Sequence, residues 1–268
     1  MKFSTWHEGL MKSTTPMALL LLFFFVAASA QAQRVSQPQS DNREALAFNE
    51  RGVDEVRAEH YAQAIDLFRR AIERQPDLAV AYNNFGATYN ALGRYTEAIQ
   101  ALQNALRLQP DYAEAHYDLG VAYYNLRRYR EAVAAYRQAI HFIPEFFDAH
   151  NRLGVAYNDW GKRNEAVKAY REAIRIKPDY AEAYNNLGTA ECERRNYQEA
   201  IAHFEKAISL KPEFATAHFN LAVARLRVKD RDAALAEYKL LTTLSPRLAD
   251  NLYAGIYRGK VLSVSAIR

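Results

Sequence analysis

Six prolines recur every 34 residues along this chain of 268 residues, and that fixed period constrains the fold more than any other feature. They are Pro76, Pro110, Pro144, Pro178, Pro212 and Pro246. A period of this length indicates a repeat architecture, in which each unit buries its apolar face against its neighbours. The repeated part of the chain divides into six segments of equal length: 45–78, 79–112, 113–146, 147–180, 181–214 and 215–248.

Small residues occupy fixed places within each segment, and large apolar residues stand three or four positions from them. This spacing is helical, and it predicts two helices per segment, near 79–92 and 95–108 in the second one. We expect the small residues to mark a close crossing of the two helices, where a bulky side chain would overpack the interface. The eighth place holds Gly52, Gly86, Gly120, Gly154, Gly188 and Ala222, and the twentieth holds Ala64, Ala98, Ala132, Ala166, Ala200 and Ala234.

The proline at place thirty-two ends the second helix, because it has no N–H group and its ring clashes with the preceding turn. An acidic residue follows it in five of the six segments: Asp77, Asp111, Glu145, Asp179 and Glu213. We expect this carboxylate to cap the next helix, where it would meet free backbone N–H groups and the positive end of the helix dipole.

The second segment carries Tyr82, Phe85-Gly86, Tyr89, Ala98, Ala105 and Pro110 at places four, seven, eight, eleven, twenty, twenty-seven and thirty-two. With these residues it resembles the tetratricopeptide repeat, and the resemblance extends over residues 45–248. The resemblance implies an all-α fold, a right-handed α-solenoid of six helix-turn-helix repeats. The first helices would line a concave groove and the second helices would form the convex face.

The ends of the chain depart from the repeat. Residues 1–32 combine Lys2 and Lys12 with a short apolar run from Met17 to Ala30 and a small-residue exit, which is typical of a secretory signal peptide. We expect residues 33–44 to be a flexible linker. After the last repeat, residues 249–268 are expected to form a capping helix closing near Gly259 and a loose basic tail, because solenoid ends need a cap.

The signal segment predicts an exported protein, periplasmic or secreted, with a retained membrane anchor as the alternative. The net charge of +4 is small, and the arginine clusters follow inter-helix turns, so we expect no nucleic-acid partner. Cys192 is the single cysteine, which excludes an intrachain disulfide and leaves a packing or groove role, with a reactive thiol as the alternative.

No constellation of catalytic or metal-binding residues is present in the sequence, so we expect neither an enzyme nor a cofactor. Three histidines share place four, where other segments have Phe48, Tyr82 and Tyr184, and this equivalence favours a packing role: His116, His150 and His218. The working part of the chain is therefore expected to be a surface.

By the resemblance, places two, five, six, nine, twelve and thirteen of each first helix face the groove, and asparagine and aromatic residues recur there. An asparagine amide carries a donor and an acceptor, so it can pair with an extended peptide, and aromatic side chains often anchor interfaces. The alternative is that some of these amides bond only the protein's own helices. The candidate partner-binding residues are Asn49, Asn83, Asn84, Asn90, Tyr117, Tyr124, Asn151, Asn158, Asn185, Asn186, Phe219 and Asn220.

The sequence thus favours an exported, non-enzymatic scaffold or adaptor that binds a peptide or a partner protein in the groove. The alternative is a structural subunit of a membrane-associated assembly, docking through its convex face or C-terminal end. Contact with a membrane would then need an uncleaved signal segment or such an assembly. Whether the chain forms a homo-oligomer stays open.

Overall fold

The computed structural model describes residues 41–258, 262 and 264, and its secondary structure over these residues is entirely helical. The predicted signal segment, residues 1–32, lies outside the described residues. A first helix spans residues 41–57. The helices that follow are α2 (Tyr61–Arg74), α3 (Ala79–Ala91), α4 (Tyr95–Leu108), α5 (Ala113–Asn125), α6 (Tyr129–Phe142), α7 (Phe147–Asp159), α8 (Arg163–Ile176), α9 (Ala181–Glu193), α10 (Tyr197–Leu210), α11 (Ala215–Arg227), α12 (Arg231–Leu244) and α13 (Pro246–Arg258).

These bounds confirm two helices in every 34-residue segment. The chain divides into two compact units, one ending at Ala81 and one beginning at Tyr82. In the N-terminal unit the first helix includes residues 41–44, which belong to the segment 33–44 that the sequence predicted to be a linker. Arg74 accounts for this difference, because its guanidinium lies 3.3 Å from the Asp41 carboxylate and 3.0 Å from that of Glu44.

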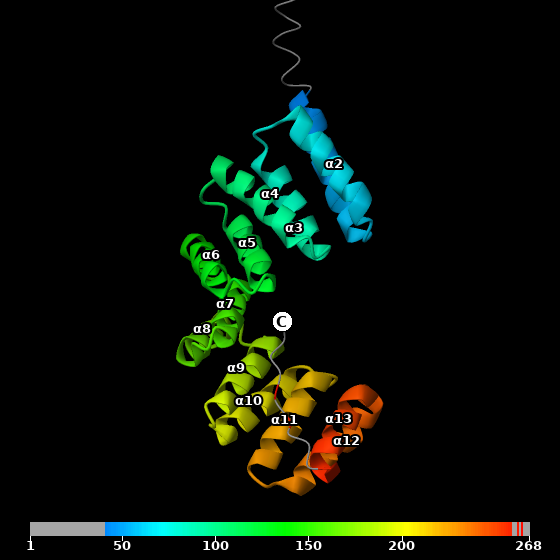
Figure 1. Ribbon diagram of the computed structural model, residues 1–268, viewed down its shortest axis with the longest axis vertical. Coiled ribbons are helices and arrows are strands. Elements are labelled where there is room, and N and C mark those ends of the chain that lie inside the picture. Colours follow the sequence, from blue (N-terminus) through cyan, green and yellow to red (C-terminus); the bar gives the residue numbers. More distant parts are fainter. Residues whose placement is uncertain (1–40, 259–261, 263, 265–268) are drawn as a thin grey trace, which may run out of the picture. The chain divides into compact units, whose positions relative to one another are not determined.

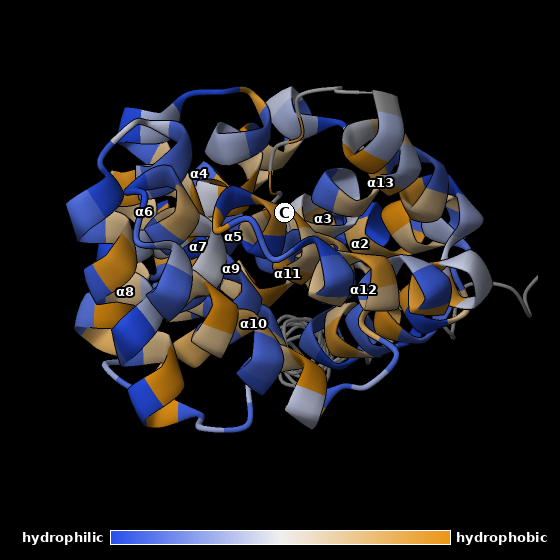
Figure 2. Cartoon of the chain, turned by 90° about the horizontal axis from the view of Figure 1, so that it is seen from below, coloured by the Kyte–Doolittle hydropathy of each residue, from blue (hydrophilic) through white to orange (hydrophobic). Residues whose placement is uncertain are grey.

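In the C-terminal unit each helix packs against the next one in the chain (Figure 1). The first helices of successive repeats also contact one another, namely α5 with α7, α7 with α9, and α9 with α11, whereas no pair of second helices does in this described part. The first helices therefore lie closer together than the second helices. We call the surface of α3, α5, α7, α9 and α11 the inner face. Both colours appear on the helices of Figure 2, as expected for helices that bury one side.

The close crossing of the two helices within each repeat is confirmed at place eight. A Cβ atom added to Gly154 would stand 2.5 Å from the ring of Tyr170, and one added to Gly120 would stand 2.6 Å from the ring of Tyr136. The same contact recurs at Gly52, Gly86 and Gly188, against Phe68, Leu102 and Phe204. All five partner side chains are almost fully buried. The missing Cβ of the glycine thus leaves the space into which one large, buried side chain of the same repeat packs.

The sixth repeat shows what happens when a Cβ occupies this place. Ala222 stands there and is fully buried, and its partner at place twenty-four is Tyr238. Tyr238 is only partly buried, unlike its five counterparts, and it stacks on Tyr253 of α13 at a centroid distance of 6.0 Å. The last repeat therefore shares its large aromatic residue with the capping helix.

The turn between the two helices of each repeat has a left-handed residue at place fifteen. Gly93 and Gly161 adopt φ values of 73° and 81° there. The other four repeats put Glu59, Arg127, Arg195 and Lys229 in the same conformation, with φ between 58° and 66°. Glycine takes this conformation without steric cost, so only two of the six turns have the residue that suits it best.

The expected capping by the acidic residues is wrong. The N-cap positions of α5, α7, α9 and α11 are Tyr112, Phe146, Tyr180 and Phe214, and none makes a side-chain capping hydrogen bond. Each acidic residue lies one position earlier, in the turn that follows the proline. Three of these helices do have an acidic residue in the first turn itself: Glu114, Asp148 and Glu182. Its negative charge interacts favourably with the positive end of the helix dipole.

We expect Gly154→Ala to destabilise the protein by about 1–3 kcal/mol, because the new methyl group must push the Tyr170 ring out of its place. Urea denaturation followed by circular dichroism measures this change. A helical glycine without such a contact would instead gain up to about 1 kcal/mol from the same substitution. A stabilised Gly154→Ala variant would therefore contradict the close crossing.

Candidate functional site

The candidate residues of the C-terminal unit all lie on the first helices, along the inner face. Most of their side chains are buried, and three are partly exposed: Asn84, Asn90 and Tyr117. Asn49, the candidate in the N-terminal unit, is also buried. The buried members in the C-terminal unit are Asn83, Tyr124, Asn151, Asn158, Asn185, Asn186, Phe219 and Asn220.

Asparagine amides at places five and six connect the first helices of successive repeats. The Asn186 Nδ2 donates to Asn151 Oδ1 at 3.1 Å, which joins α9 to α7, and the Asn220 Nδ2 donates to Asn185 Oδ1 at 2.9 Å, which joins α11 to α9. Within α9 the Asn185 Nδ2 donates to Asn186 Oδ1 at 3.4 Å. We call these four residues the amide ladder. It corresponds to the alternative that the sequence left open, in which amides bond the protein's own helices.

Place twelve carries a second set of bonds between repeats. The Asn90 Nδ2 donates to the backbone carbonyl of Asp118 at 2.8 Å, and this bond joins α3 to α5. The Tyr124 hydroxyl donates to the Asp159 carboxylate at 2.6 Å, and the Asn158 Nδ2 donates to the Glu193 carboxylate at 3.3 Å. Both bonds reach one repeat further along the chain. The two sets of bonds fix the spacing of the first helices, and with it the geometry of the inner face.

Polar and aromatic side chains remain partly exposed where α3, α5 and α7 meet. We call Asn84, Asn90, Tyr117, Asp118 and Arg152 the inner-face patch. Burial raises the pKa of the Tyr117 hydroxyl, and the nearby Arg152 guanidinium partly offsets this shift; the Tyr117 ring packs on that of Phe146 at 5.0 Å. Burial raises the pKa of Asp118 to about 7, and the nearby negative charge of Glu114 adds to the shift. The patch thus offers hydrogen-bond donors, acceptors and an aromatic ring on one surface.

Some acceptors along the inner face have no hydrogen-bond partner within the described structure. They are the buried side-chain oxygens of Asn83, Asn90 and Asn158. Buried polar atoms are paired in most proteins, so each of these oxygens calls for a donor that the described residues do not supply.

The histidines at place four have a structural role. The Nε2 of His116 lies 2.9 Å from the carbonyl oxygen of Pro110, and His150 and His218 repeat this contact with Pro144 and Pro212. Each ring thus links a first helix to the proline turn before it. The Nδ1 of His218 also meets the Glu237 carboxylate at 2.6 Å, and this hydrogen bond raises the pKa of His218.

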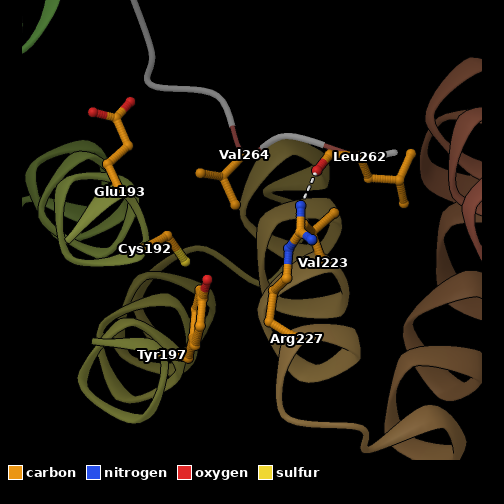
Figure 3. Close-up of a pocket in the computed structure, with 7 residues that line it drawn as sticks. All are labelled: Cys192, Glu193, Tyr197, Val223, Arg227, Leu262 and Val264. Atoms are coloured by element: carbon orange, nitrogen blue, oxygen red, sulfur yellow. Dashed lines mark hydrogen bonds between the residues drawn. The ribbon is translucent and has the colours of Figure 1, made fainter. Parts of the chain in front are cut away.

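The C-terminal tail departs from its prediction as a loose segment, because two of its residues lie on the inner face. Leu262 is 9% exposed and belongs to one buried cluster with Phe219, Val223 and Leu252. Val264 packs against that cluster and against a second one that contains Cys192 and Leu221. The Arg227 guanidinium donates a 2.7 Å hydrogen bond to the Leu262 carbonyl oxygen (Figure 3).

Cys192 lies beside this tail, in a cavity of about 260 Å³. Burial raises the pKa of its thiol to about 12, which the positive charge of Arg227 only partly offsets. A thiol reacts as the thiolate, so Cys192 is an unreactive packing residue in this arrangement. Among residues 41–258, 262 and 264, no group of three or more His, Cys, Asp and Glu side chains is placed to hold a metal ion.

Sequence reasoning did not find the charged members of the patch or the packed tail. Asp118 and Arg152 stand at place six, where three other repeats have asparagine, and this contrast was the available signal. The tail signal was weaker: the run Val261-Leu262-Ser263-Val264 is apolar at three of four positions in a segment outside the repeats.

No helix of the described residues is both long and apolar enough to cross a membrane.

Comparison with protein families identifies the repeat. The model of the TPR repeat matches residues 86–126 and 156–191, and two models of the tetratricopeptide repeat match residues 113–146, 181–214 and 67–100. Together they cover more than half of the chain, and the fold agrees with them. The chain belongs to the tetratricopeptide repeat family, whose members are generally non-catalytic modules for protein–protein interaction.

Solved structures of this kind resemble the chain closely in fold. MamA is 28% identical, with a TM-score of 0.57 over 61% of this chain and 96% of its own. PilF of Pseudomonas aeruginosa is 18% identical, with a TM-score of 0.70 over 81% and 99% of the two chains. YrrB, described as a TPR protein with an unusual peptide-binding site, is 24% identical, with a TM-score of 0.56 over 69% and 96%. No curated protein matched the sequence.

We expect Asn185→Ala to destabilise the protein by about 1–3 kcal/mol, because the buried Asn220 amide would lose its acceptor. Urea denaturation measures the change. Asn125→Ala is the matched control, since Asn125 is exposed and donates only to Val121 of its own helix. Equal stability of the Asn185→Ala variant and the parent would show that the ladder does not hold the repeats together.

We expect Asp118→Asn to stabilise the protein more at pH 7.5 than at pH 4.5. The folded-state pKa of about 7 lies above the unfolded value near 4, so ionisation opposes folding increasingly as the pH rises through this window. Denaturation of both proteins at pH 4.5, 6 and 7.5 measures the difference. The exposed Asp111→Asn serves as control, and a pH-independent difference at Asp118 would refute the raised pKa.

Proposed function

We propose that this protein is an exported, non-enzymatic adaptor that binds an extended peptide, or an extended segment of a partner protein, on its inner face. The inner-face patch is the observation that carries the proposal. It gathers an aromatic ring, two amides and both signs of charge on three successive first helices, and all five side chains are partly exposed.

The structure around the patch supports a binding role, since bonds between repeats fix the helices that present it. A preformed surface loses little conformational entropy when a ligand binds. The partly exposed amide of Asn84 carries a donor and an acceptor, which suit the backbone groups of an extended peptide. The amide ladder itself is buried and engaged, so we assign it to shaping the surface and assign contact with the partner to the patch.

The non-enzymatic part of the proposal is supported by the family, whose members generally serve as interaction modules. A binding site for peptides is also named for YrrB, which shares this fold. The patch joins one carboxylate, one guanidinium and one phenol, without a nucleophile that another of these groups activates.

We expect replacement of patch amides to weaken partner binding without unfolding the protein. The partner would be captured by cross-linking in the compartment where the protein resides and quantified by mass spectrometry. The Asn84→Ala/Asn90→Ala variant should recover at least tenfold less of it than the parent. Asn104→Ala is the matched control, because Asn104 lies on the second helix α4 and donates to Gln100 of its own helix. Undiminished recovery by a folded double variant would refute the patch as the binding site.

Export is proposed from the signal-like segment 1–32. The mature protein should begin at Gln33, after cleavage behind the Ala30-Gln31-Ala32 exit, and mass spectrometry of its N-terminal peptide measures this. Recovery of chains that all keep residues 1–32 in the cytoplasmic fraction would refute export.

A further inference from the structure

Two residues of the C-terminal tail lie against α9 and α11 on the inner face, three and five residues after the expected end of the cap at Gly259. We propose that the surface of α9 and α11 under these two residues is a second peptide-binding site. It recognises an extended segment with large aliphatic residues two positions apart. The chain's own tail occupies this site until a partner segment displaces the tail. We call it the tail site, lined by Cys192, Tyr197, Val223 and Arg227. The inference rests on the proposed function, which it extends to a second ligand class and to its regulation.

The spacing of the two buried side chains defines the ligand pattern. In an extended chain, residues two apart point to the same side, so Leu262 and Val264 can face the same surface. Leu262 joins the buried cluster of Phe219, Val223 and Leu252, and Val264 reaches the neighbouring cluster around Cys192 and Leu221. The tail thus bridges the first helices of the fifth and sixth repeats, as a bound peptide would.

Arg227 supplies the polar anchor of the site. Its guanidinium donates to a backbone carbonyl, that of Leu262, at 2.7 Å (Figure 3). A charge-assisted hydrogen bond to the main chain is strong and independent of the ligand's side chains. Arg227 is the last residue of α11, and the Val223 side chain lies one turn before it, so one helix offers an apolar contact and a carbonyl anchor together.

Leu262 and Val264 leave a cavity between themselves and the helices of the site. The cavity of about 260 Å³ lies between Cys192, Glu193 and Tyr197 on one side and Val223, Arg227 and Leu262 on the other, with Val264 between the two sides (Figure 3). Val264, only partly buried, therefore leaves room for a larger aliphatic or aromatic side chain at its position. A partner segment with such a residue would make contacts that the tail lacks, which gives it the advantage needed for displacement.

Displacement must overcome the tether. A ligand attached through a short linker has an effective concentration in the millimolar range. A free peptide with the tail's own sequence therefore competes poorly with the tail, while a tail that cannot bind leaves the site open. This difference makes the proposal testable with the complete chain.

The test measures binding of a fluorescein-labelled peptide with the sequence of residues 259–268, GKVLSVSAIR, by fluorescence anisotropy. Leu262→Asp/Val264→Asp in the full chain places two charges where apolar clusters now receive the tail, so the tail should leave the site. This variant should bind the peptide at least tenfold more tightly than the parent. A scrambled peptide of the same composition, in which no two of the residues Val, Leu and Ile stand two positions apart, should bind neither protein.

Arg227→Gln, added to the double variant, should weaken peptide binding roughly tenfold, because it removes the charged donor to the carbonyl. Lys229→Gln removes the same charge two residues further on, at an exposed turn position, and should leave the affinity unchanged. Equal effects of the two substitutions would indicate a general loss of attraction for the peptide and would overturn the anchor role of Arg227.

Cys192 provides an independent readout, since it is the single cysteine of the chain and lies under Val264. Alkylation by iodoacetamide should be at least tenfold faster in the double variant than in the parent, and added peptide should restore protection. Far-ultraviolet circular dichroism must show unchanged helix content, and Leu262→Ala, a milder change, should move both readouts in the same direction.

Three results would overturn the proposal: no peptide binding by either folded tail variant, equal affinity of parent and double variant, or a parent that is a dimer only while its tail is intact. The last result would show exchange of tails between copies. Each of them leaves the Asn84 and Asn90 experiment unaffected, and loss of the partner there leaves the tail site untouched, so the two proposals fail separately.

Discussion

The packing of one large side chain against one glycine, repeated along the chain, is the contact on which the rest of this structure depends. With Gly154 in place, the Tyr170 ring fills the crossing of α7 and α8, and the same arrangement holds with phenylalanine, leucine or tyrosine elsewhere. The identity of the large residue varies because the space is defined by the missing Cβ. The last repeat has Ala222 instead, and its Tyr238 turns into a contact with the capping helix. The repeat that lacks the glycine is therefore the last one of the array.

Asparagine side-chain amides then fix the position of each repeat relative to the next one. A buried asparagine that donates to the asparagine of the preceding repeat costs desolvation, but both groups are satisfied and their geometry fixes the register. This explains how one residue type can both suggest a binding groove and serve the scaffold. The amides of the ladder hold the helices, whereas Asn84 and Asn90 of the inner-face patch stay partly exposed, together with Tyr117, Asp118 and Arg152.

The inner-face patch and the tail site both lie on the first helices of the repeats. The first helices contact one another along the inner face, and between α9 and α11 apolar side chains receive Leu262 and Val264. Arg227 is the polar anchor of the tail there. In the proposed function, the tail at α9 and α11 and the inner-face patch lie at different places along the first helices, so a partner segment would compete with the tail only at the tail site.

The sequence by itself determined the fold: the 34-residue period, the small residues at places eight and twenty and the proline at the end of each unit predicted every helix pair. Local spacing suffices for this because each repeat touches mainly its neighbours. It did not determine which asparagines are buried and which stay partly exposed, since a buried Asn185 and a partly exposed Asn84 occupy adjacent, equally polar places. Only the tertiary structure decided that, because burial depends on how far one repeat is rotated against the next. It also placed Leu262 and Val264, whose contacts on α9 and α11 lie about 40 to 70 residues away in the chain and follow no period.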